Sequence, residues 1–182
     1  MRAPGARVFL TLVTHKRAPI LTRYDHVRRL RETLAVVART RPFRCWAAVI
    51  LPDHLHLLIE LPPGDAAFST RVMLIKSRFQ PDHRLALAHP SASRQRRRER
   101  TIWQRRFWEH TIRDDRDFEA HMDYIHFNPV KHGLASCPHA WPHSSFHRWA
   151  RAGRYPGDWG CGCARPALPP PNALLAAATA GE

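Results

Sequence analysis

The segment LPDHLHLLIE, residues 51–60, decides how the rest of the chain is interpreted. Alternate side chains of a strand lie on the same face, so His54 and His56 are expected to point the same way. Two neutral imidazoles at this spacing can hold a divalent metal ion. The alternative is a pair of half-exposed histidines without a metal, and the spacing alone does not decide between the two.

The residues before this pair predict a strand and an interruption. Residues 43–51 are apolar enough to form a strand buried in a sheet. We expect that strand to continue past Pro52 into residues 54–60, with a bulge or break at the proline, because proline is awkward in a central strand. Such a break would aim His54 and His56 at a cleft.

The charge balance indicates a polyanionic partner. The 182 residues include 29 Lys+Arg against 15 Asp+Glu, a net charge of +14, whereas the 44% hydrophobic and 24% charged residues are ordinary for a single globular domain. An arginine-rich excess of this size is typical of nucleic-acid binding. A GC-rich genome would explain arginine over lysine, but it would not explain the shortage of acidic residues.

The sequence predicts a cytoplasmic, reduced protein. Its N-terminus lacks the apolar region of a signal peptide, and no apolar run is long enough to span a membrane. Cys45 is expected to be an inert buried thiol in a strand. Cys161 and Cys163 lie near several histidines, so a zinc knuckle is conceivable, although the spacing of the four cysteines, Cys137 included, differs from that of common zinc sites.

Further elements follow from local patterns. Residues 8–14 are β-branched and aromatic and predict a first strand. Apolar positions recur at helical spacing over residues 24–39, and Thr22 or Asp25 could cap that helix. Its arginines are interpreted mainly as a solvated face.

A turn and a second helix are expected next. The LPPGD segment at residues 61–65 predicts the turn. Ser69 is expected to cap a helix that runs to about residue 80. Arg71, Lys76 and Arg78 are placed on its solvent side.

Basic and aromatic side chains dominate residues 94–110. The segment RQRRRER, residues 94–100, places five arginines in seven positions, and WQRRFWEH, residues 103–110, interleaves arginine with tryptophan and phenylalanine. Bases can stack on such rings while guanidinium groups bind phosphates, but the rings could equally be core residues. The predicted DNA-binding residues are basic or aromatic: Arg94, Arg96, Arg97, Arg98, Trp103, Arg105, Arg106, Trp108 and Lys131.

A helix carries the second half of the candidate site. We expect it to begin at Asp114 or Asp115 and to end at about residue 128, where Pro129 should stop it. Helical geometry places His121, Tyr124 and Asn128 on one face. A tyrosine hydroxyl one turn before an amide oxygen is a nucleophile beside a candidate third metal ligand. Taken separately, the tyrosine could be a core residue and the asparagine a helix stop.

Four motifs in this order resemble those of the REP-associated tyrosine transposases, relatives of the single-tyrosine, His-hydrophobic-His transposases of bacterial insertion sequences. The motifs are LPDHLH (51–56), residues 68–76, IWQRRFWEHTI (102–112) and DYIHFNPVKHGL (123–134), with support from WPHSSFH (141–147) and GRYPGDW (153–159). The resemblance covers residues 8–160.

The resemblance implies an α+β fold, in which helices pack against an antiparallel sheet in a ferredoxin-like sandwich. Residues 1–160 are then the catalytic domain, and residues 161–182 are expected to form a disordered tail rich in proline and alanine. The histidine pair should lie on a central strand, with the tyrosine on a late helix that faces it.

The resemblance also implies the chemistry. His54, His56 and Asn128 would hold Mg²⁺ or Mn²⁺, while Tyr124 would cleave and rejoin single-stranded DNA at a REP-type hairpin through a 5′-phosphotyrosine. His121 is the candidate general base or supporting residue, and the protein would act as a monomer or homodimer. Two alternatives stay open: a non-catalytic protein that binds DNA hairpins, and an RNA-binding or RNA-processing module.

Overall fold

The computed structural model describes residues 5–79 and 102–162. These ranges contain four strands, four α-helices and two short 3-10 helices. They are β1 (Arg7–Val13), η1 (His15–Arg17), α1 (Tyr24–Thr40), β2 (Arg44–Ile50), β3 (His54–Glu60), α2 (Phe68–Arg78), β4 (Trp108–Thr111), α4 (Asp115–Lys131), η3 (Pro138–Ala140) and α5 (Phe146–Arg151). The predicted irregular stretch 81–101 and the tail from residue 163 lie outside the described residues.

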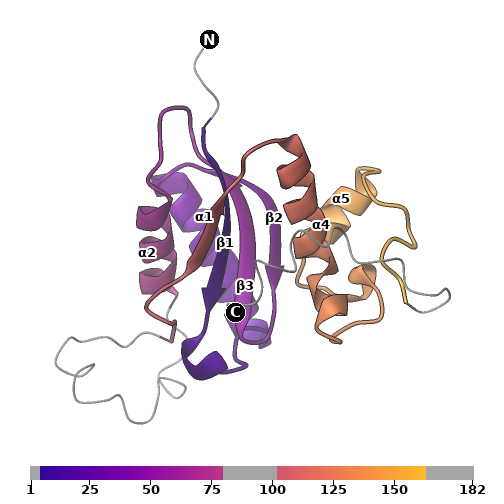
Figure 1. The fold of residues 1–182 in the computed structure, drawn as a ribbon. Coiled ribbons are helices and arrows are strands. Elements are labelled where there is room, and N and C mark those ends of the chain that lie inside the picture. The colour runs from indigo at the N-terminus through magenta and orange to yellow at the C-terminus, as the bar shows by residue number, and fades with distance from the viewer. Residues whose placement is uncertain (1–4, 80–101, 163–182) are drawn as a thin grey trace.

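The four strands form one antiparallel sheet in the order β2-β3-β1-β4 (Figure 1). The element order βαββαβ with this strand order is the ferredoxin-like arrangement. The predicted fold class is therefore confirmed, and β3, which carries the histidine pair, is an interior strand.

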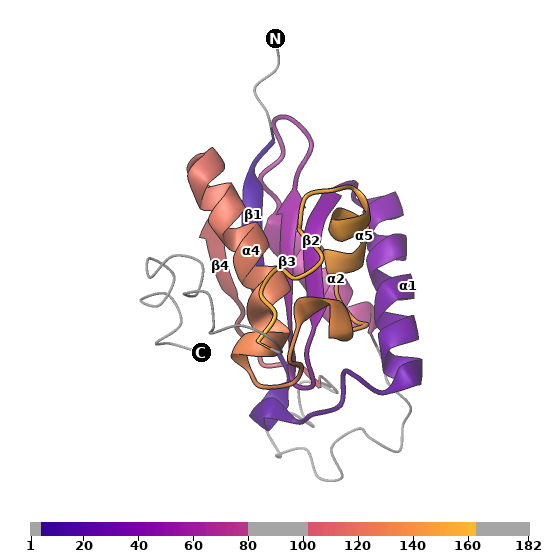
Figure 2. The same cartoon turned by 90° about the vertical axis from the view of Figure 1, so that its right-hand side faces the viewer.

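Alternation along the strands divides the core into two layers. Val8, Leu10 and Leu12 of β1 belong to the cluster that packs against α1 and α2, whereas Phe9 and Leu58 belong to the cluster that packs against α4. Figures 1 and 2 show α1 and α2 on one side of the sheet and α4 with α5 on the other. Complete burial of each large aliphatic side chain contributes about 1.5–3 kcal/mol. The face towards α4 is the one that bears the site.

The chain reverses at Pro52 instead of continuing as one interrupted strand, so that prediction was wrong. Pro52 and Asp53 form a tight turn, closed by a hydrogen bond of 2.9 Å from the Leu51 N–H to the His54 carbonyl, and β2 pairs with β3 as a hairpin. Proline favours the second position of a turn because its φ is already fixed there. The histidine pair consequently begins a new strand.

The predicted helix caps were wrong, although both helices exist. The N-cap of α1 is Arg23 and that of α2 is Ala67, and neither side chain makes a capping bond in the described structure. Asp25 lies within the first turn of α1, where a carboxylate favours the helix dipole. Ser69 lies inside α2. The predicted turn at residues 61–65 is confirmed: the Asp65 N–H donates to the Pro62 carbonyl at 3.0 Å.

Arg71 is only 1% exposed, contrary to its predicted place on the solvent side of α2. Its guanidinium donates to the Asp65 carboxylate at 2.6 and 3.3 Å. It also donates to the backbone carbonyls of Arg41, Pro42 and Ala67. A buried guanidinium is tolerated only when its donors are satisfied. The residue therefore joins the start of α2 to the end of α1.

Helix α4 continues through Pro129 to residue 131, so the predicted stop was one turn early. Asp114 is its N-cap, as expected, and accepts a bond of 2.8 Å from an N–H of the first turn. Proline near the end of a helix removes only one hydrogen bond, and the His132 N–H still donates to the Asn128 carbonyl at 3.0 Å. Gly133 follows the C-cap residue His132, and its φ of +66° suits glycine.

The segment that contains α5 packs beside α4 on the same side of the sheet. The His126 ring bonds to the Tyr155 hydroxyl at 2.9 Å and to the Ser145 hydroxyl at 2.8 Å. Phe146 stacks on Tyr155 and Trp159. These contacts bury α4 on two sides and fix the helix against the sheet. Within the described ranges, none of the helices combines the length and the apolar character needed to cross a bilayer.

Candidate metal and nucleophile site

His54 and His56 lie side by side on one face of β3, as the strand period predicts, and α4 covers this face. Their ring centroids are 4.9 Å apart, and the two side chains are 4% and 0% exposed. The prediction of a pair on one face is confirmed, and the alternative of half-exposed histidines is wrong. Such burial demands partners for the ring nitrogens.

One nitrogen of each ring has a partner from the protein. Nδ1 of His54 lies 2.6 Å from the Asp53 carboxylate, and Nδ1 of His56 lies 2.9 Å from the hydroxyl of Thr11, its cross-strand neighbour. Burial opposes ionisation of Asp53, but hydrogen bonds from His54 and Arg17 hold the pKa of this carboxyl below its ordinary value. A carboxylate can only accept, so Nδ1 of His54 donates, and Nε2 is the nitrogen that can bind a metal ion.

The electrostatic surroundings keep His56 neutral. Burial lowers the pKa of His56 well below its ordinary value, and the nearby His54, His132 and Lys131 lower it further. A neutral imidazole is the form that binds metal ions. The ring is therefore in a ligating protonation state at neutral pH.

Three buried side chains of the site have polar atoms without a hydrogen-bond partner among the described residues. These atoms are Nε2 of His54, Nε2 of His56 and both amide atoms of Asn128. Asn128 is 0% exposed. An unsatisfied buried polar group costs about 1–3 kcal/mol, and such groups in folded proteins call for an explanation. Two imidazole nitrogens and one amide oxygen form a donor set that suits a divalent cation, so these residues fit a metal.

Tyr124 projects from α4 onto the histidine pair. Its ring centroid is 5.4 Å from that of His56 and 5.8 Å from that of Phe9, and the side chain is 9% exposed. The Lys131 ammonium lies 3.4 Å from the tyrosine hydroxyl and 4.8 Å from the ring centroid. The predicted nucleophile and the predicted metal ligand His56 are thus in contact.

His121 belongs to a network one turn earlier on α4. Its Nδ1 donates to the Asp117 carbonyl at 2.8 Å, and its ring stacks on His110 with centroids 4.7 Å apart. Despite burial, hydrogen bonds from His110 and Arg113 lower the pKa of Asp117 to about 2. Burial lowers the pKa of His121, although Asp117 partly offsets this. His121 and Tyr124 both contact Phe9.

The His110, Asp117 and His121 side chains are also close enough to hold a metal ion, with ligand atoms within 4.8 Å of one another. However, His110 and Arg113 already donate to the Asp117 carboxylate, at 2.7 and 3.2 Å. This set is satisfied by the protein itself, whereas the His54 set is not. The His54 set is therefore the better metal site.

The predicted DNA-binding residues divide into three groups. Arg94, Arg96, Arg97 and Arg98 lie outside the described residues. Arg105, Arg106 and Lys131 are exposed, and Trp108 is half-buried on β4. Trp103 is 0% exposed and packs on Phe79, which favours the core interpretation of this ring and removes it from the candidate DNA surface.

Lys76 holds the segment that carries the two exposed arginines. Its ammonium donates to the Gln104 carbonyl at 2.9 Å and to the Arg106 carbonyl at 3.0 Å. Burial lowers the pKa of this lysine to about 8. Lys76 is thus not the freely solvated residue that its position on α2 predicted, and it fixes the backbone beneath Arg105 and Arg106.

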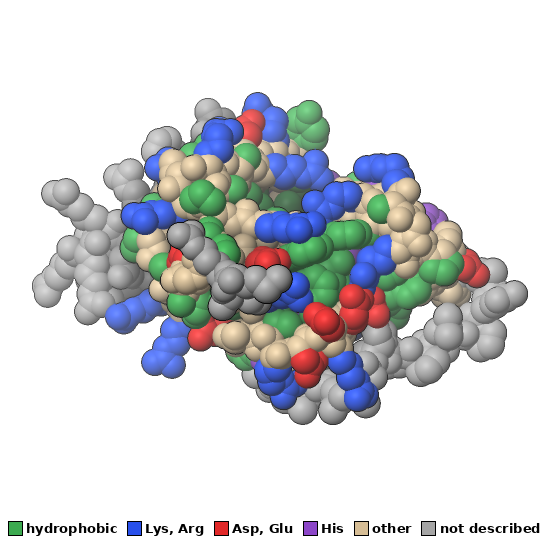
Figure 3. All heavy atoms as spheres, turned by 90° about the horizontal axis from the view of Figure 1, so that it is seen from above, with side chains coloured by type: hydrophobic (Ala, Val, Ile, Leu, Met, Phe, Trp, Pro, Cys, Tyr) green, Lys and Arg blue, Asp and Glu red, His purple; other side chains and the backbone are tan. Residues whose placement is uncertain are grey.

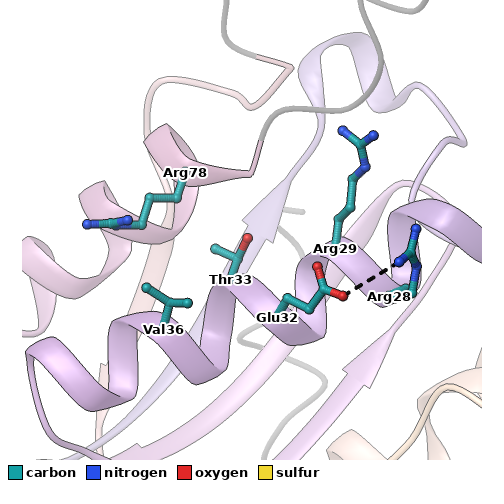
Figure 4. Close-up of a pocket in the computed structure, with 6 residues that line it drawn as sticks. All are labelled: Arg28, Arg29, Glu32, Thr33, Val36 and Arg78. Atoms are coloured by element: carbon teal, nitrogen blue, oxygen red, sulfur yellow. Dashed lines mark ion pairs between the residues drawn. The ribbon is translucent and has the colours of Figure 1, made fainter.

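Basic side chains are spread over the face of the molecule that Figure 3 shows. Seen from above, Lys and Arg side chains surround a strip of hydrophobic ones, with acidic side chains beside them (Figure 3). A pocket of about 570 Å³ lies between α1 and α2, and three of its six lining residues are arginines (Figure 4). It is lined by Arg28, Arg29, Glu32, Thr33, Val36 and Arg78. Because α1 and α2 cover the face opposite to α4, this pocket is separate from the histidine pair (Figure 2).

Sequence patterns missed four residues around the site: Phe9, Thr11, Asp53 and His132. The ring of His132 lies 5.3 Å from that of His54. It was missed because the helix was predicted to stop before it. Thr11 and Phe9 reach the site through strand pairing, which leaves no local signal. The Asp53–His54 contact at the turn could have been inferred, because the two residues are neighbours in the sequence.

Comparison with known proteins identifies the family. The profile described as "Transposase IS200 like" matches residues 5–128, a span that contains His54, His56, Tyr124 and Asn128. The chain belongs to the IS200-like transposase family. This transposase is 40% identical over 155 residues to the REP-associated tyrosine transposase of Escherichia coli strain K12, covering 85% of this chain and 84% of that protein.

Two further comparisons agree. A Haemophilus influenzae protein, assigned by name to the REP-associated tyrosine transposases, is 43% identical over 157 residues, covering 86% of this chain and 88% of its own. A solved structure described as a REP-associated tyrosine transposase bound to a REP hairpin superposes with a TM-score of 0.71 at 38% identity, covering 87% of each chain. The transposase is thus an enzyme of the tyrosine class, as the resemblance implied.

Proposed function

We propose that this transposase cleaves and rejoins single-stranded DNA at REP-type hairpins, with Tyr124 as nucleophile and a divalent metal ion as cofactor. The observation that carries the proposal is the arrangement at the N-terminal end of β3. There, the buried Nε2 atoms of His54 and His56 have no partner among the described residues, and Tyr124 contacts His56. The buried amide of Asn128, one turn after Tyr124 on α4, has no partner among them either. A protein that only bound hairpins would not require this combination.

His54 and His56 would hold the metal through Nε2, and Asn128 through its amide oxygen. Asp53 orients the first ring and Thr11 the second, and partners of this kind commonly fix the tautomer of a ligating histidine. An amide oxygen suits Mn²⁺ and Mg²⁺, and neutral imidazole is a common ligand of divalent metal ions. When bound, the ion would polarise the scissile phosphate and offset the negative charge that develops on it.

Tyr124 would form the covalent bond to the DNA. Its Oη attacks the phosphorus while the bond from phosphorus to the 3′ oxygen breaks, which leaves a 5′-phosphotyrosine and a 3′-hydroxyl. The ordinary pKa of tyrosine is about 10, so the phenol needs help to lose its proton. The Lys131 ammonium, 3.4 Å from Oη, favours the phenolate, and His121 is the candidate base on the same helix.

The covalent intermediate makes the reaction reversible. The phosphotyrosine keeps a phosphodiester bond in place of the one that was cleaved, so a 3′-hydroxyl can attack it and release Tyr124 without an external energy source. Strand transfer therefore requires no residues beyond those that cleave.

Relatives and surface charge support the choice of substrate. The related structure described as bound to a REP hairpin is similar over 87% of this chain. The proposed contacts to DNA are basic or aromatic: Arg94, Arg96, Arg97, Arg98, Arg105, Arg106, Trp108 and Lys131. Arg105 and Arg106 are exposed next to β4, so they can reach phosphates.

A cleavage assay with the full chain tests the proposal. Hairpins with single-stranded flanks, taken from the DNA around its own gene, would be labelled at the 3′ end and incubated with Mn²⁺ or EDTA. We expect Mn²⁺-dependent cleavage that is lost in Tyr124→Phe and retained in Tyr24→Phe, a tyrosine that is 82% exposed. Tight binding without cleavage would favour the non-catalytic hairpin binder. Equal cleavage of RNA by Tyr124→Phe would favour the RNA-processing module.

A further inference from the structure

A third group of side chains that could bind a metal follows α4 in the chain and contains none of the proposed catalytic residues. The ligand atoms of Cys137, His139 and Cys161 lie within 4.8 Å of one another. The Cys161 sulfur is 3.5 Å from Nδ1 of His139, although the two residues are 22 positions apart in the chain. The fold has therefore brought two thiols and an imidazole together.

The separation between the Cys161 sulfur and the His139 nitrogen matches that of a tetrahedral zinc site. With Zn–S of about 2.3 Å and Zn–N of about 2.0 Å, a sulfur and a nitrogen on one ion lie about 3.5 Å apart, and two sulfurs lie about 3.8 Å apart. The Cys161–His139 distance has this value, and the third ligand atom lies within the range that small rotations of the side chains can close. A set of two thiolates and an imidazole binds Zn²⁺ in preference to Mg²⁺ or Mn²⁺.

The backbone fixes the two segments that carry these side chains. The Gly162 N–H donates to the Ser136 carbonyl at 2.9 Å, which joins the residues beside Cys161 and Cys137. Gly160 has a φ of +66°, and a Cβ there would lie 3.0 Å from the Phe127 side chain, so glycine allows the chain to pass close to α4.

The three ligands also differ in accessibility. Cys137 is 1% exposed, Cys161 is half-buried and His139 is exposed. An ion would therefore be held at the surface, with one side open to solvent.

We propose that Cys137, His139 and Cys161 bind a structural Zn²⁺-type ion that fastens the segment after Trp159 to η3. A fourth ligand, either water or a donor from outside this group, would complete the tetrahedron. The site differs in place and in chemistry from the nitrogen and oxygen donors proposed for catalysis. The sequence-based hypothesis of a knuckle combined Cys161 and Cys163 with nearby histidines. Here Cys161 meets His139 and Cys137, and Cys163 lies outside the described residues.

Cobalt substitution in the full chain tests this site directly. Reduced, metal-free protein would be titrated with Co²⁺, which gives a thiolate-to-metal charge-transfer band only when bound by cysteine sulfur. We expect one equivalent of Co²⁺ with this band, displaced by one equivalent of Zn²⁺. Cys137→Ser and Cys161→Ser should each weaken Co²⁺ binding at least tenfold and reduce the band.

Two variants serve as controls. Cys45→Ser removes a thiol in β2, and the double variant His54→Ala/His56→Ala removes the proposed catalytic ligands; both should keep the band. Failure of the catalytic proposal would thus leave this result unaffected. Absence of the band in reduced wild-type protein, or a band unchanged in both Cys137→Ser and Cys161→Ser, would overturn the site. A Cys137–Cys161 disulfide found by mass spectrometry in protein purified without oxidant would also overturn it.

Discussion

Replacement of Asn128 by leucine tests whether the buried polar groups of the site are arranged for a metal. The side chain is 0% exposed, and neither amide atom has a partner among the residues that the structure describes. An unsatisfied buried group costs about 1–3 kcal/mol, whereas an apolar group of similar shape carries no such cost. We therefore expect metal-free Asn128→Leu to be about 1–3 kcal/mol more stable to urea than the metal-free wild type.

Metal should reverse this advantage. An ion at a concentration of about 100 times its Kd stabilises the protein that binds it by about 2.7 kcal/mol. For a chain of this size the gain corresponds to about 5–10 °C in Tm. Wild-type protein should show this rise with Mn²⁺, and Asn128→Leu should show a much smaller rise. Urea denaturation in EDTA and thermal unfolding with Mn²⁺ measure the two effects.

His126→Leu is the matched control, because His126 is equally buried on the same helix but both its ring nitrogens are bonded. This variant should lose about 1–3 kcal/mol and keep the full response to Mn²⁺. If Asn128→Leu is instead destabilised like the control and keeps the response, Asn128 is neither unsatisfied nor a ligand, and the reasoning fails.

Three further variants test other parts of the structure: the Thr11 hydroxyl beside His56, the Asp117 carboxylate and the buried Arg71 guanidinium. Thr11→Val removes the hydroxyl beside Nδ1 of His56. With the fold intact, it should weaken Mn²⁺ binding about 10–100-fold in a calorimetric titration. An unchanged affinity for Mn²⁺ would mean that the hydroxyl does not position the ring. Because the pKa of Asp117 is lowered from 3.8 to about 2, its ionised form stabilises the fold above pH 4, and this contribution is lost as pH falls towards 2. Asp117→Asn should therefore cost about 2 kcal/mol at pH 7 and progressively less below pH 4 in urea denaturation, and a cost independent of pH would contradict the assignment. Arg71→Met should lower the free energy of unfolding by about 3 kcal/mol, because Asp65 and three carbonyls lose their donor. DNA cleavage per folded molecule should be unchanged. A loss of activity in the folded variant would show that Arg71 acts in the site.

The parts of the site that follow a local period could be predicted from the sequence. The period of two in a strand places His54 and His56 on one face, and helical spacing places His121 and Tyr124 on the side of α4 that meets Phe9. The approach of the two elements required the resemblance to a known family, since no local pattern indicates which face of α4 meets the sheet. The roles of the site residues stay predictions.

The errors arose where distant segments or side-chain length decide the outcome. Pro52 was interpreted as an interruption within a strand, because the pairing of β2 with β3 is a contact that a local window does not contain. Arg71 was assigned to solvent by its charge, but its long side chain reaches carbonyls at the end of α1. Trp103 was left open between core and DNA, and its burial depends on a contact with Phe79 from α2.

The central claim is that Tyr124 becomes linked to DNA, and trapping that intermediate tests it most directly. Wild-type protein would be mixed with a single-stranded hairpin substrate and Mn²⁺, denatured in SDS, and digested for mass spectrometry. We expect an SDS-stable adduct whose modified peptide carries a 5′-phosphate on Tyr124, absent with EDTA and absent in Tyr124→Phe. An adduct on another residue, or cleavage by Tyr124→Phe at the wild-type rate, would contradict the account.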